Sequence, residues 1–476
     1  MSTSDLEKIR EISAEGGMTR GQKSVLIALL TTAVVFFLFA PIMTLKVIVT
    51  IAILNYAVNV AYKVYIMCHT SGGSAILTPL PEDYEYPVYT ILAPVRGEEA
   101  IINQLIRNLM NQDYPHDKLQ VFLIVDEDDK KTCQAAEEAH KPFFMQVVVV
   151  PDSWEGPRGK PRAMNYVAKH GMIKGKYTVV YDGEDAPEPD QLKKAAAAFE
   201  LYPHIDCFQA VLRWWNENQN WYTRMIALSY ANNFNSMLRG LAATGGIFPL
   251  GGTSNHIRTR VLVSLDFWDE FNVTEDFALG VAMALAGYKC MILPSITWEE
   301  ATTNFTRQAK QNSRWIKGHT ATAIAFTKDP IFLARKLGLK GLLSFYSVVF
   351  AAHPAMIAAP LFWAMTTLYA LTSAGIIREI TPSFTFYMGT LCLLTNAVFL
   401  WTAGLALLRS GQFKLWPWIF TLPIYWVSVL TMGSLKAVYE VFSGRLYYWD
   451  KTEHGLVHRK EEHTVAPALV VALGDD

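Results

Sequence analysis

The chain has 476 residues, of which 51% are hydrophobic and 18% are charged, and its formal net charge is −1 at pH 7. A nearly neutral chain lacks the basic face that nucleic-acid binding requires, so we expect no nucleic-acid partner. The five cysteines share no metal-ligand spacing and no obvious pairing, and we predict that they are reduced structural residues. They are Cys68, Cys133, Cys207, Cys290 and Cys392.

Apolar residues gather at both ends of the chain. Residues 1–23 are polar and charged, unlike a cleaved signal peptide, and are predicted to be a cytoplasmic segment. Residues 24–68 are almost uncharged and long enough for two transmembrane helices of about 20 residues each. Two crossings keep the segment before them and the domain after them on one side, and Arg10, Arg20 and Lys23 favour the cytoplasm for that side.

Residues 69–318 are predicted to form a cytoplasmic α/β domain between the membrane segments. Short apolar runs of strand length alternate there with helical patterns. This alternation implies a mostly parallel sheet with helices on both faces, and ligands of such sheets bind at the carboxyl ends of the strands. The apolar runs are 87–93, 119–125, 146–150 and 177–181.

A first acidic cluster follows the run 119–125 directly. A carboxylate run in this place is typical of a solvated turn or a helix cap, and it is also where a sheet of this kind binds its ligand. The cluster consists of Asp126, Glu127, Asp128 and Asp129.

A second acidic cluster follows the run 177–181 and begins with Asp182, Glu184 and Asp185. Acidic groups one residue apart at a strand end can face one hard divalent cation, which prefers oxygen ligands and bridges well to a diphosphate. Turn chemistry explains the prolines of this segment, but it does not explain three acids facing a cleft.

Thr274, Glu275 and Asp276 form a third acidic feature. Asn272 or Thr274 can cap a helix whose first turn carries acids that complement the helix dipole. This structural interpretation is compatible with a role in catalysis.

About 35 residues later, Gln311, Arg314 and Trp315 are spaced so that a helix presents them on one face. An amide, a guanidinium and an indole on one face can hold a sugar chain by hydrogen bonds and stacking. An amphipathic helix at the membrane surface would also place Arg and Trp together.

The carboxyl-terminal third is predicted to return to the membrane. Residues 319–340 mix apolar residues with lysine and arginine and are predicted to form an interfacial amphipathic helix. Residues 341–442 form apolar blocks that allow three or four crossings. Residues 443–476 are predicted to be a cytoplasmic tail, which requires four crossings.

The order and spacing of these motifs resemble those of membrane-embedded, processive family 2 glycosyltransferases, the class of bacterial cellulose and hyaluronan synthases. The resemblance implies a GT-A-type nucleotide-sugar transferase domain. It also implies that Asp276, with Glu275 beside it, is the catalytic base, and that Asp182 and Glu184 bind Mg²⁺ or Mn²⁺. Glu184 departs from the Asp-x-Asp pattern of the family.

The resemblance implies further binding residues. The predicted nucleotide-sugar site is Asp126, Glu127, Asp128, Lys160 and Asp182. The predicted acceptor site is Gln311, Arg314, Trp315, Gly252 and Thr253. A loose match to a gating loop covers Trp449, Lys451, Thr452 and His454.

The function implied by the resemblance is an inverting, metal-dependent transferase of the inner or plasma membrane. It would polymerise a β-linked polysaccharide from a nucleotide sugar, for example UDP-glucose or a related UDP-hexose, and pass the product across the bilayer. Two alternatives remain at this stage. One is a non-processive transferase that adds one sugar to a lipid acceptor, and the other is a transporter or receptor with a degenerate transferase-like domain. The sequence identifies no export partner.

Overall fold

The computed structural model describes residues 2–350, 364 and 383–447. The residues predicted to form a gating loop lie outside this part of the chain; they are Trp449, Lys451, Thr452 and His454. Four of the five cysteines, Cys68, Cys133, Cys207 and Cys290, are free thiols.

An eight-stranded sheet forms the centre of the domain, in the order β3-β2-β1-β4-β7-β6-β8-β5. The pairs among β3, β2, β1 and β4 are parallel, as is the pair β6 and β8. β7 runs antiparallel to both of its neighbours, and β5 runs antiparallel to β8. The predicted α/β fold with a mostly parallel sheet is confirmed. The strands are β1 (Tyr89–Val95), β2 (Leu119–Asp126), β3 (Met145–Val150), β4 (Tyr177–Val180), β5 (Ala186–Pro187), β6 (Cys207–Trp214), β7 (Asn255–Arg258) and β8 (Cys290–Glu299).

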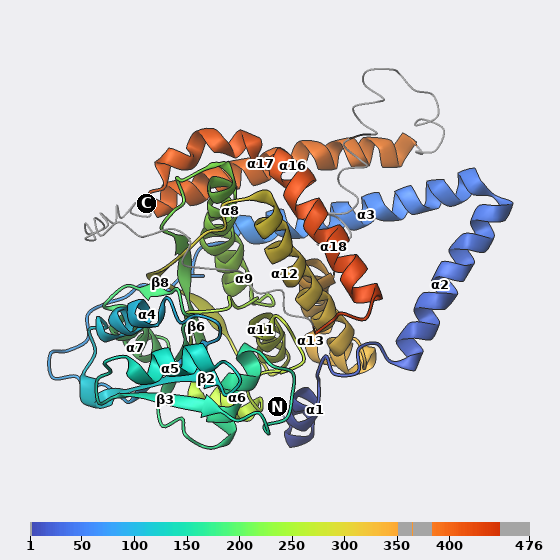
Figure 1. The fold of residues 1–476 in the computed structure, drawn as a ribbon. Coiled ribbons are helices and arrows are strands. Elements are labelled where there is room, and N and C mark those ends of the chain that lie inside the picture. Colours follow the sequence, from blue (N-terminus) through green and yellow to red (C-terminus); the bar gives the residue numbers. More distant parts are fainter. Residues whose placement is uncertain (1, 351–363, 365–382, 448–476) are drawn as a thin grey trace.

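Helices cover both faces of this sheet, which is why its central strands are almost continuously apolar. Successive side chains of a strand point to opposite faces, so Ile91 and Leu92 enter different hydrophobic cores although both are fully buried. Figure 1 shows the sheet enclosed by short helices. They are α4 (Ile102–Met110), α5 (Lys130–Glu138), α6 (Lys160–Lys169), α7 (Gln191–Leu201), α8 (Trp221–Asn232), α9 (Leu238–Thr244), α10 (Thr259–Ser264) and α11 (Glu275–Leu285).

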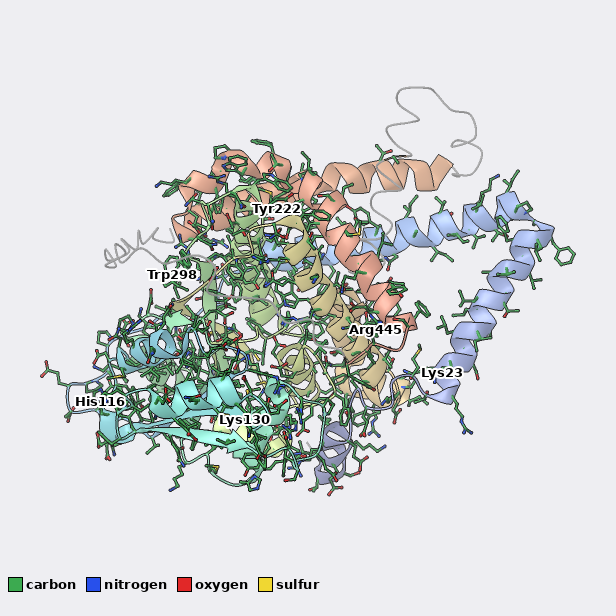
Figure 2. All side chains as sticks on the ribbon, viewed as in Figure 1. Lys23, His116, Lys130, Tyr222, Trp298 and Arg445 are labelled. Carbon is green, nitrogen blue, oxygen red and sulfur yellow. The ribbon has the colours of Figure 1, made fainter. Side chains whose placement is uncertain are left out.

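Two long apolar helices, α2 (Arg20–Phe39) and α3 (Pro41–Cys68), precede the domain. Both are long and apolar enough to cross a membrane, and so is the helical stretch Phe413–Phe442. Figure 2 shows α2 standing apart from the rest of the molecule with side chains on both sides of it, and none of them is buried. Large apolar side chains left outside a protein core indicate a lipid environment.

The stretch Phe413–Phe442 is built from several short helical segments, and α16 precedes it. Pro417 lies inside the 3₁₀ segment, where it removes a hydrogen-bond donor, and Pro423 lies in the first turn of α17, where a proline is tolerated. The preceding helix α16 spans Ser383–Ser410. The stretch itself consists of a 3₁₀ segment (Phe413–Thr421), α17 (Leu422–Tyr425), a π-type turn (Trp426–Leu430) and α18 (Thr431–Phe442).

α12 (Phe305–Phe326) connects the domain to the membrane segments and runs through residue 318, where the sequence suggested the domain boundary. α18 packs closely on it: a Cβ on Gly433 would lie 2.9 Å from the Cβ of Asn312. A buried ion pair joins the same two helices, with Lys317 Nζ 2.9 Å from Glu440 Oε2. The following helix, α13 (Pro330–Phe345), overlaps the predicted interfacial helix and breaks at Gly338, whose φ of 60° is left-handed.

Candidate active site

A cavity of about 670 Å³ opens at the carboxyl ends of β1, β2 and β4. Its wall brings together the ends of these strands, the start of α6, the start of α11 and one face of α12. The acidic clusters that the sequence placed at strand ends therefore meet at one site.

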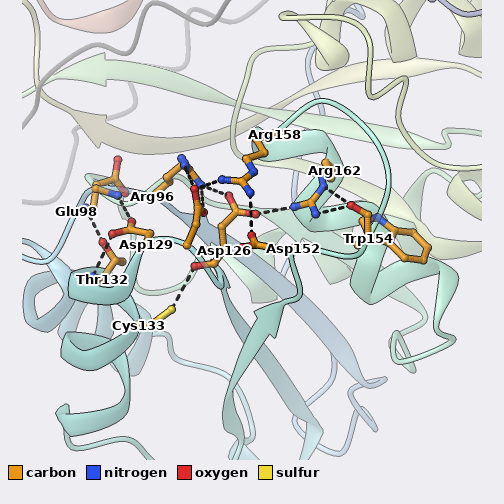
Figure 3. A network of polar contacts seen from close by, with 12 residues as sticks. Arg96, Glu98, Asp126, Asp129, Thr132, Cys133, Asp152, Trp154, Arg158 and Arg162 are labelled. Carbon is orange, nitrogen blue, oxygen red and sulfur yellow. Dashed lines mark hydrogen bonds and ion pairs between the residues drawn. The ribbon is translucent and has the colours of Figure 1, made fainter.

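An arginine network organises the first acidic cluster (Figure 3). Arg96, directly after β1, donates to Asp126 at 2.7 Å and makes two bonds of 2.8 Å with Asp128. Arg162 of α6 is almost fully buried and donates to the other oxygen of Asp126 at 2.8 Å. The Arg96 hydrogen bonds lower the pKa of Asp128 to about 2, so this carboxylate stays ionised near neutral pH.

Asp129 caps a helix, which is the structural role that its position in the sequence suggested. It is the N-cap of α5 and accepts a hydrogen bond of 3.3 Å from the backbone N–H of Thr132. It also accepts from the N–H of Gly97, which ties the end of β1 to the same turn. Asp129 thus caps a helix and also lines the cavity together with Asp126 and Asp128.

Lys160 is the central cation of the cavity. Its ammonium group donates to Asp182 at 2.5 Å and to the carbonyl of Gly252. Burial alone would lower the pKa of Lys160, but Asp182, Glu275 and Asp276 outweigh burial and raise it. Lys160 is therefore charged at neutral pH.

Gly252 leaves an open space among these groups. A Cβ at this position would lie 3.8 Å from Asp182 Oδ2, 3.9 Å from Asp276 Oδ2 and 4.0 Å from Lys160 Nζ. The second acidic cluster, the Thr-Glu-Asp motif and the lysine therefore converge on one point.

The roles of Glu184 and Asp185, which the sequence left open, differ in the structure. Glu184 lines the cavity, whereas Asp185 is fully buried behind it. One Asp185 oxygen accepts from the N–H of Asp182 at 2.7 Å and from the hydroxyl of Thr253. Burial, and then the carboxylates of Asp182 and Glu184, raise the pKa of Asp185. Asp185 thus shapes the turn that presents Asp182.

Glu275 and Asp276 form the first turn of α11, next to the dipole's positive end. Thr274 is the N-cap residue, but its side chain makes no capping bond to the helix. Burial raises the pKa of Asp276, and Lys160 opposes that rise. Burial and the charge of Asp276 raise the pKa of Glu275. A carboxylate with a raised pKa is a stronger base than a solvated one, which suits proton transfer.

Arg314 and Trp315 reach the cavity from α12. The Trp315 ring is half-buried and lies 6.1 Å from the ring of Tyr230, measured between centroids. Gln311 is buried beside them, and its Oε1 has no hydrogen-bond partner within the described part of the chain. The side chains of α12 predicted to hold an acceptor thus lie at or next to the cavity.

The structure brings most of the predicted site residues together and leaves three off the cavity wall. Glu127 accepts a hydrogen bond of 2.9 Å from the N–H of Asp152, Thr253 is buried against Asp185, and Gln311 is buried away from the wall. The predicted residues on the wall are Asp126, Asp128, Lys160, Asp182, Glu184, Gly252, Glu275, Asp276, Arg314 and Trp315.

The wall residues that were not foreseen from the sequence include Arg96, Arg158 and Tyr447. Arg96 follows an apolar strand run, and that position at the binding edge of the sheet could have identified it. Arg158 is next to the predicted Lys160 segment. Tyr447 had no local signal, because its place depends on contacts with the first residues of the chain.

Comparison with known proteins identifies the domain. Residues 87–318 match the family model described as "Glycosyltransferase like family 2". The chain contains a family 2 glycosyltransferase domain. The glycosyltransferase domain coincides with the sheet, its covering helices and the first half of α12.

Named relatives and a solved structure agree with this assignment. The chain is 23% identical over 322 residues to "Probable glycosyltransferase YdaM" of Bacillus subtilis, covering 64% of this chain and 72% of that protein. It is 28% identical over 236 residues to "Beta-monoglucosyldiacylglycerol synthase" of Trichormus variabilis, covering 49% of each. The chain thus spans about half the length of that relative.

The mannosyltransferase PcManGT of Pyrobaculum calidifontis, solved with GDP-Man and Mn²⁺, superimposes with a TM-score of 0.50 at 17% identity. The superposition covers 83% of this chain and 99% of that one. This likeness, together with the family match, shows that the sheet and its helices have the GT-A-like fold.

Proposed function

We propose that the protein is an inverting glycosyltransferase that takes a sugar from a nucleotide donor and builds a β-linked polysaccharide at the membrane. The observation that carries the proposal is the convergence of Lys160, Asp182 and Asp276 on one point of a cavity that also reaches Trp315. A cation, a metal-binding acid, a base and an aromatic platform are the groups that such a transfer needs.

The donor would lie along the arginine-lined side of the cavity. Arg96 and Arg158 organise Asp126 and Asp128, and they hold positive charge where a diphosphate can bind. GDP-Man in the related fold of PcManGT supports a nucleotide-sugar donor. We propose a UDP-hexose as the donor class, following the resemblance of the sequence motifs.

Asp182 and Glu184 fit a Mg²⁺ or Mn²⁺ site that is completed by substrate. No group of three His, Cys, Asp or Glu side chains among the described residues could hold a metal by itself. Magnesium in phosphate sites is commonly bound by one or two carboxylates together with substrate phosphates and water, so two acids on the wall suffice. When bound, the cation would neutralise charge that develops on the departing diphosphate.

Asp276 would accept the proton of the attacking acceptor hydroxyl. Its raised pKa favours proton acceptance, and the helix start of α11 fixes its carboxylate at the cavity wall. Lys160 holds positive charge beside Asp182, where the leaving diphosphate would gain negative charge. A single displacement of this kind inverts the anomeric centre, so an α-linked donor yields a β-glycoside.

Trp315 and Arg314 would hold the growing chain beside the reacting carbon. The indole face can stack on a sugar ring, and the guanidinium can donate to its hydroxyls. The apolar helices on either side of the domain would carry the product through the bilayer, with the domain on the cytoplasmic side as the positive charges near the amino terminus favour.

A second candidate is transfer of a single sugar to a lipid acceptor. The similarity to β-monoglucosyldiacylglycerol synthase over the catalytic domain favours it. The chemistry at Asp276 would be the same, and only the acceptor would differ.

The test is to incubate the full-length protein in lipid vesicles with a panel of nucleotide sugars and Mg²⁺ or Mn²⁺. Released nucleoside diphosphate, polymer and glycolipid are measured in the same reaction, followed by linkage analysis. We expect a long β-linked polymer, no product in excess EDTA, and none from Asp182→Asn or Asp276→Asn. A single sugar on lipid would establish the second candidate, and full activity in EDTA would exclude the metal.

A further inference from the structure

The amino-terminal segment 2–17 packs on the glycosyltransferase domain. Within it, α1 (Thr3–Arg10) buries Ile9 to 3% exposure, and the turn that follows buries Ala14 completely. Both side chains join the hydrophobic core on one face of the sheet.

The turn after α1 is hydrogen-bonded to the loop that leads to the proposed catalytic base. Ser13 Oγ donates to Asp269 Oδ1 at 2.7 Å, and the N–H of Ala14 donates to Asp269 Oδ2 at 2.7 Å. Asp269 also accepts from the N–H of Phe271 at 3.1 Å. The loop 269–274 runs directly into Glu275 and Asp276, so these hydrogen bonds hold the segment that positions the two carboxylates.

The same turn holds Tyr447, which lies beyond the end of α18. The Tyr447 hydroxyl donates to the carbonyl of Ala14 at 2.8 Å. Its ring meets the ring of Phe271 edge-on, with centroids 5.8 Å apart. We call these residues the rim clasp; they are Ser13, Ala14, Asp269, Phe271 and Tyr447.

Tyr447 lies on the cavity wall beside the proposed nucleotide site. It lines the cavity itself and also a small hollow between the loop 157–161 and the loop 270–275. The first of these loops carries Arg158, which pairs with Asp128 in the arginine network. Tyr447 therefore lines the same hollow as Arg158, one of the residues that would receive the donor.

A lysine also anchors the rim clasp to the end of α12. Lys328, in the turn after α12, donates to the carbonyls of Ser13 and Glu15 at 2.8 Å each. Four hydrogen bonds thus fix the backbone and side chain of the short turn 13–15 from two directions. A rigid support of this kind lowers the entropy cost of holding a binding residue in place.

We propose that the rim clasp positions Tyr447 over the nucleotide-sugar pocket, which makes the amino-terminal segment a determinant of donor affinity. Tyr447 is the residue that contacts the donor, while Ser13 and Asp269 are positioning residues that act through it. The inference rests on the function proposed for this pocket.

The experiment measures donor KM, kcat and nucleoside diphosphate affinity for the full-length protein in lipid. The variants are Ser13→Ala, Tyr447→Phe, their double variant and the conservative Ser13→Thr, with exposed Glu11→Ala as the matched control. We expect Ser13→Ala and Tyr447→Phe each to raise the donor KM and to lower the diphosphate affinity by about 2- to 10-fold, the range of one hydrogen bond, with kcat nearly unchanged. Ser13→Thr keeps the hydroxyl and should restore affinity.

The double variant should be weakened by less than the product of the two single effects, because both changes loosen one structure. The inference is overturned if Ser13→Ala and Tyr447→Phe bind donor as tightly as the control does, or if they lower only kcat. A wild-type protein that turns over no nucleotide sugar would overturn the proposed function as well. An active wild type with unaffected clasp variants would overturn this inference alone.

Discussion

Replacing Lys160 by methionine should move the pH dependence of turnover in a direction that the structure specifies. Asp276 must be unprotonated to act as a base, so activity is present above its pKa and is lost as the pH falls through it. Burial raises that pKa, and Lys160 opposes the rise. Lys160→Met removes the opposing charge at similar side-chain length, so the acid limb of the pH profile should move to higher pH.

The size of the shift follows from the positions of the two groups. Lys160 Nζ and Asp276 Oδ2 lie within 4.0 and 3.9 Å of the same point beside Gly252, so they are no more than about 8 Å apart. Two unit charges at that distance interact by about 2 kcal/mol with an effective dielectric constant of about 20. This corresponds to an upward shift of about 1.5 pH units.

The assay follows kcat against pH with saturating donor and a constant excess of divalent cation, so that any bound metal contributes equally to every variant. Lys169→Met is the matched control, because Lys169 lies on the same helix and pairs with Asp266 at the surface, 3.6 Å away. We expect Lys169→Met to keep the wild-type acid limb. An acid limb for Lys160→Met that stays in place, or moves to lower pH, would refute the assignment of Asp276 as the base under the influence of Lys160.

Three further substitutions test separate parts of the structure. Trp315→Ala should remove polymer formation but leave slow transfer of the donor sugar to water, measured as nucleoside diphosphate released without incorporated sugar; normal polymer would contradict the platform role. Arg162→Met removes a buried partner of Asp126 and should lower the free energy of unfolding by about 3–5 kcal/mol, seen as a reduced melting temperature. Gly240→Ala should prevent stable accumulation in membranes, because its Cβ would lie 2.0 Å from the carbonyl oxygen of Ile66; wild-type yield of folded protein would show that the two helices can separate.

The strands and acidic clusters could be predicted because their signals are local. The run before Asp126 is apolar at every position except Gln120, as expected for a strand covered on both faces, and the acid follows where that strand ends. Asp182 follows β4 in the same way, and both acids lie at the binding edge of the sheet. The spacing of Gln311, Arg314 and Trp315 on one helix was only partly informative, because Arg314 and Trp315 reach the wall whereas Gln311 is buried.

The rest depended on contacts between distant parts of the chain. Thr253 lies next to Gly252 in sequence, but the backbone turns its side chain inward to Asp185. β7 lies antiparallel between β4 and β6. Its four residues are too few to show a sequence pattern that would predict these pairing partners. Tyr447 reaches the cavity only because Ala14, separated from it by 433 positions, accepts its hydrogen bond.

The buried pair of Lys317 and Glu440 has a consequence for the order in which the molecule is made. The ribosome completes the catalytic sheet and α12 long before it reaches α18, so for an extended period the carboxylate that neutralises Lys317 has not been synthesised. Leaving such a charge without its partner in an apolar interface is costly, and this disfavours final seating of α12. Since α12 carries Trp315, we expect the nascent chain to make no polymer until α18 has been inserted.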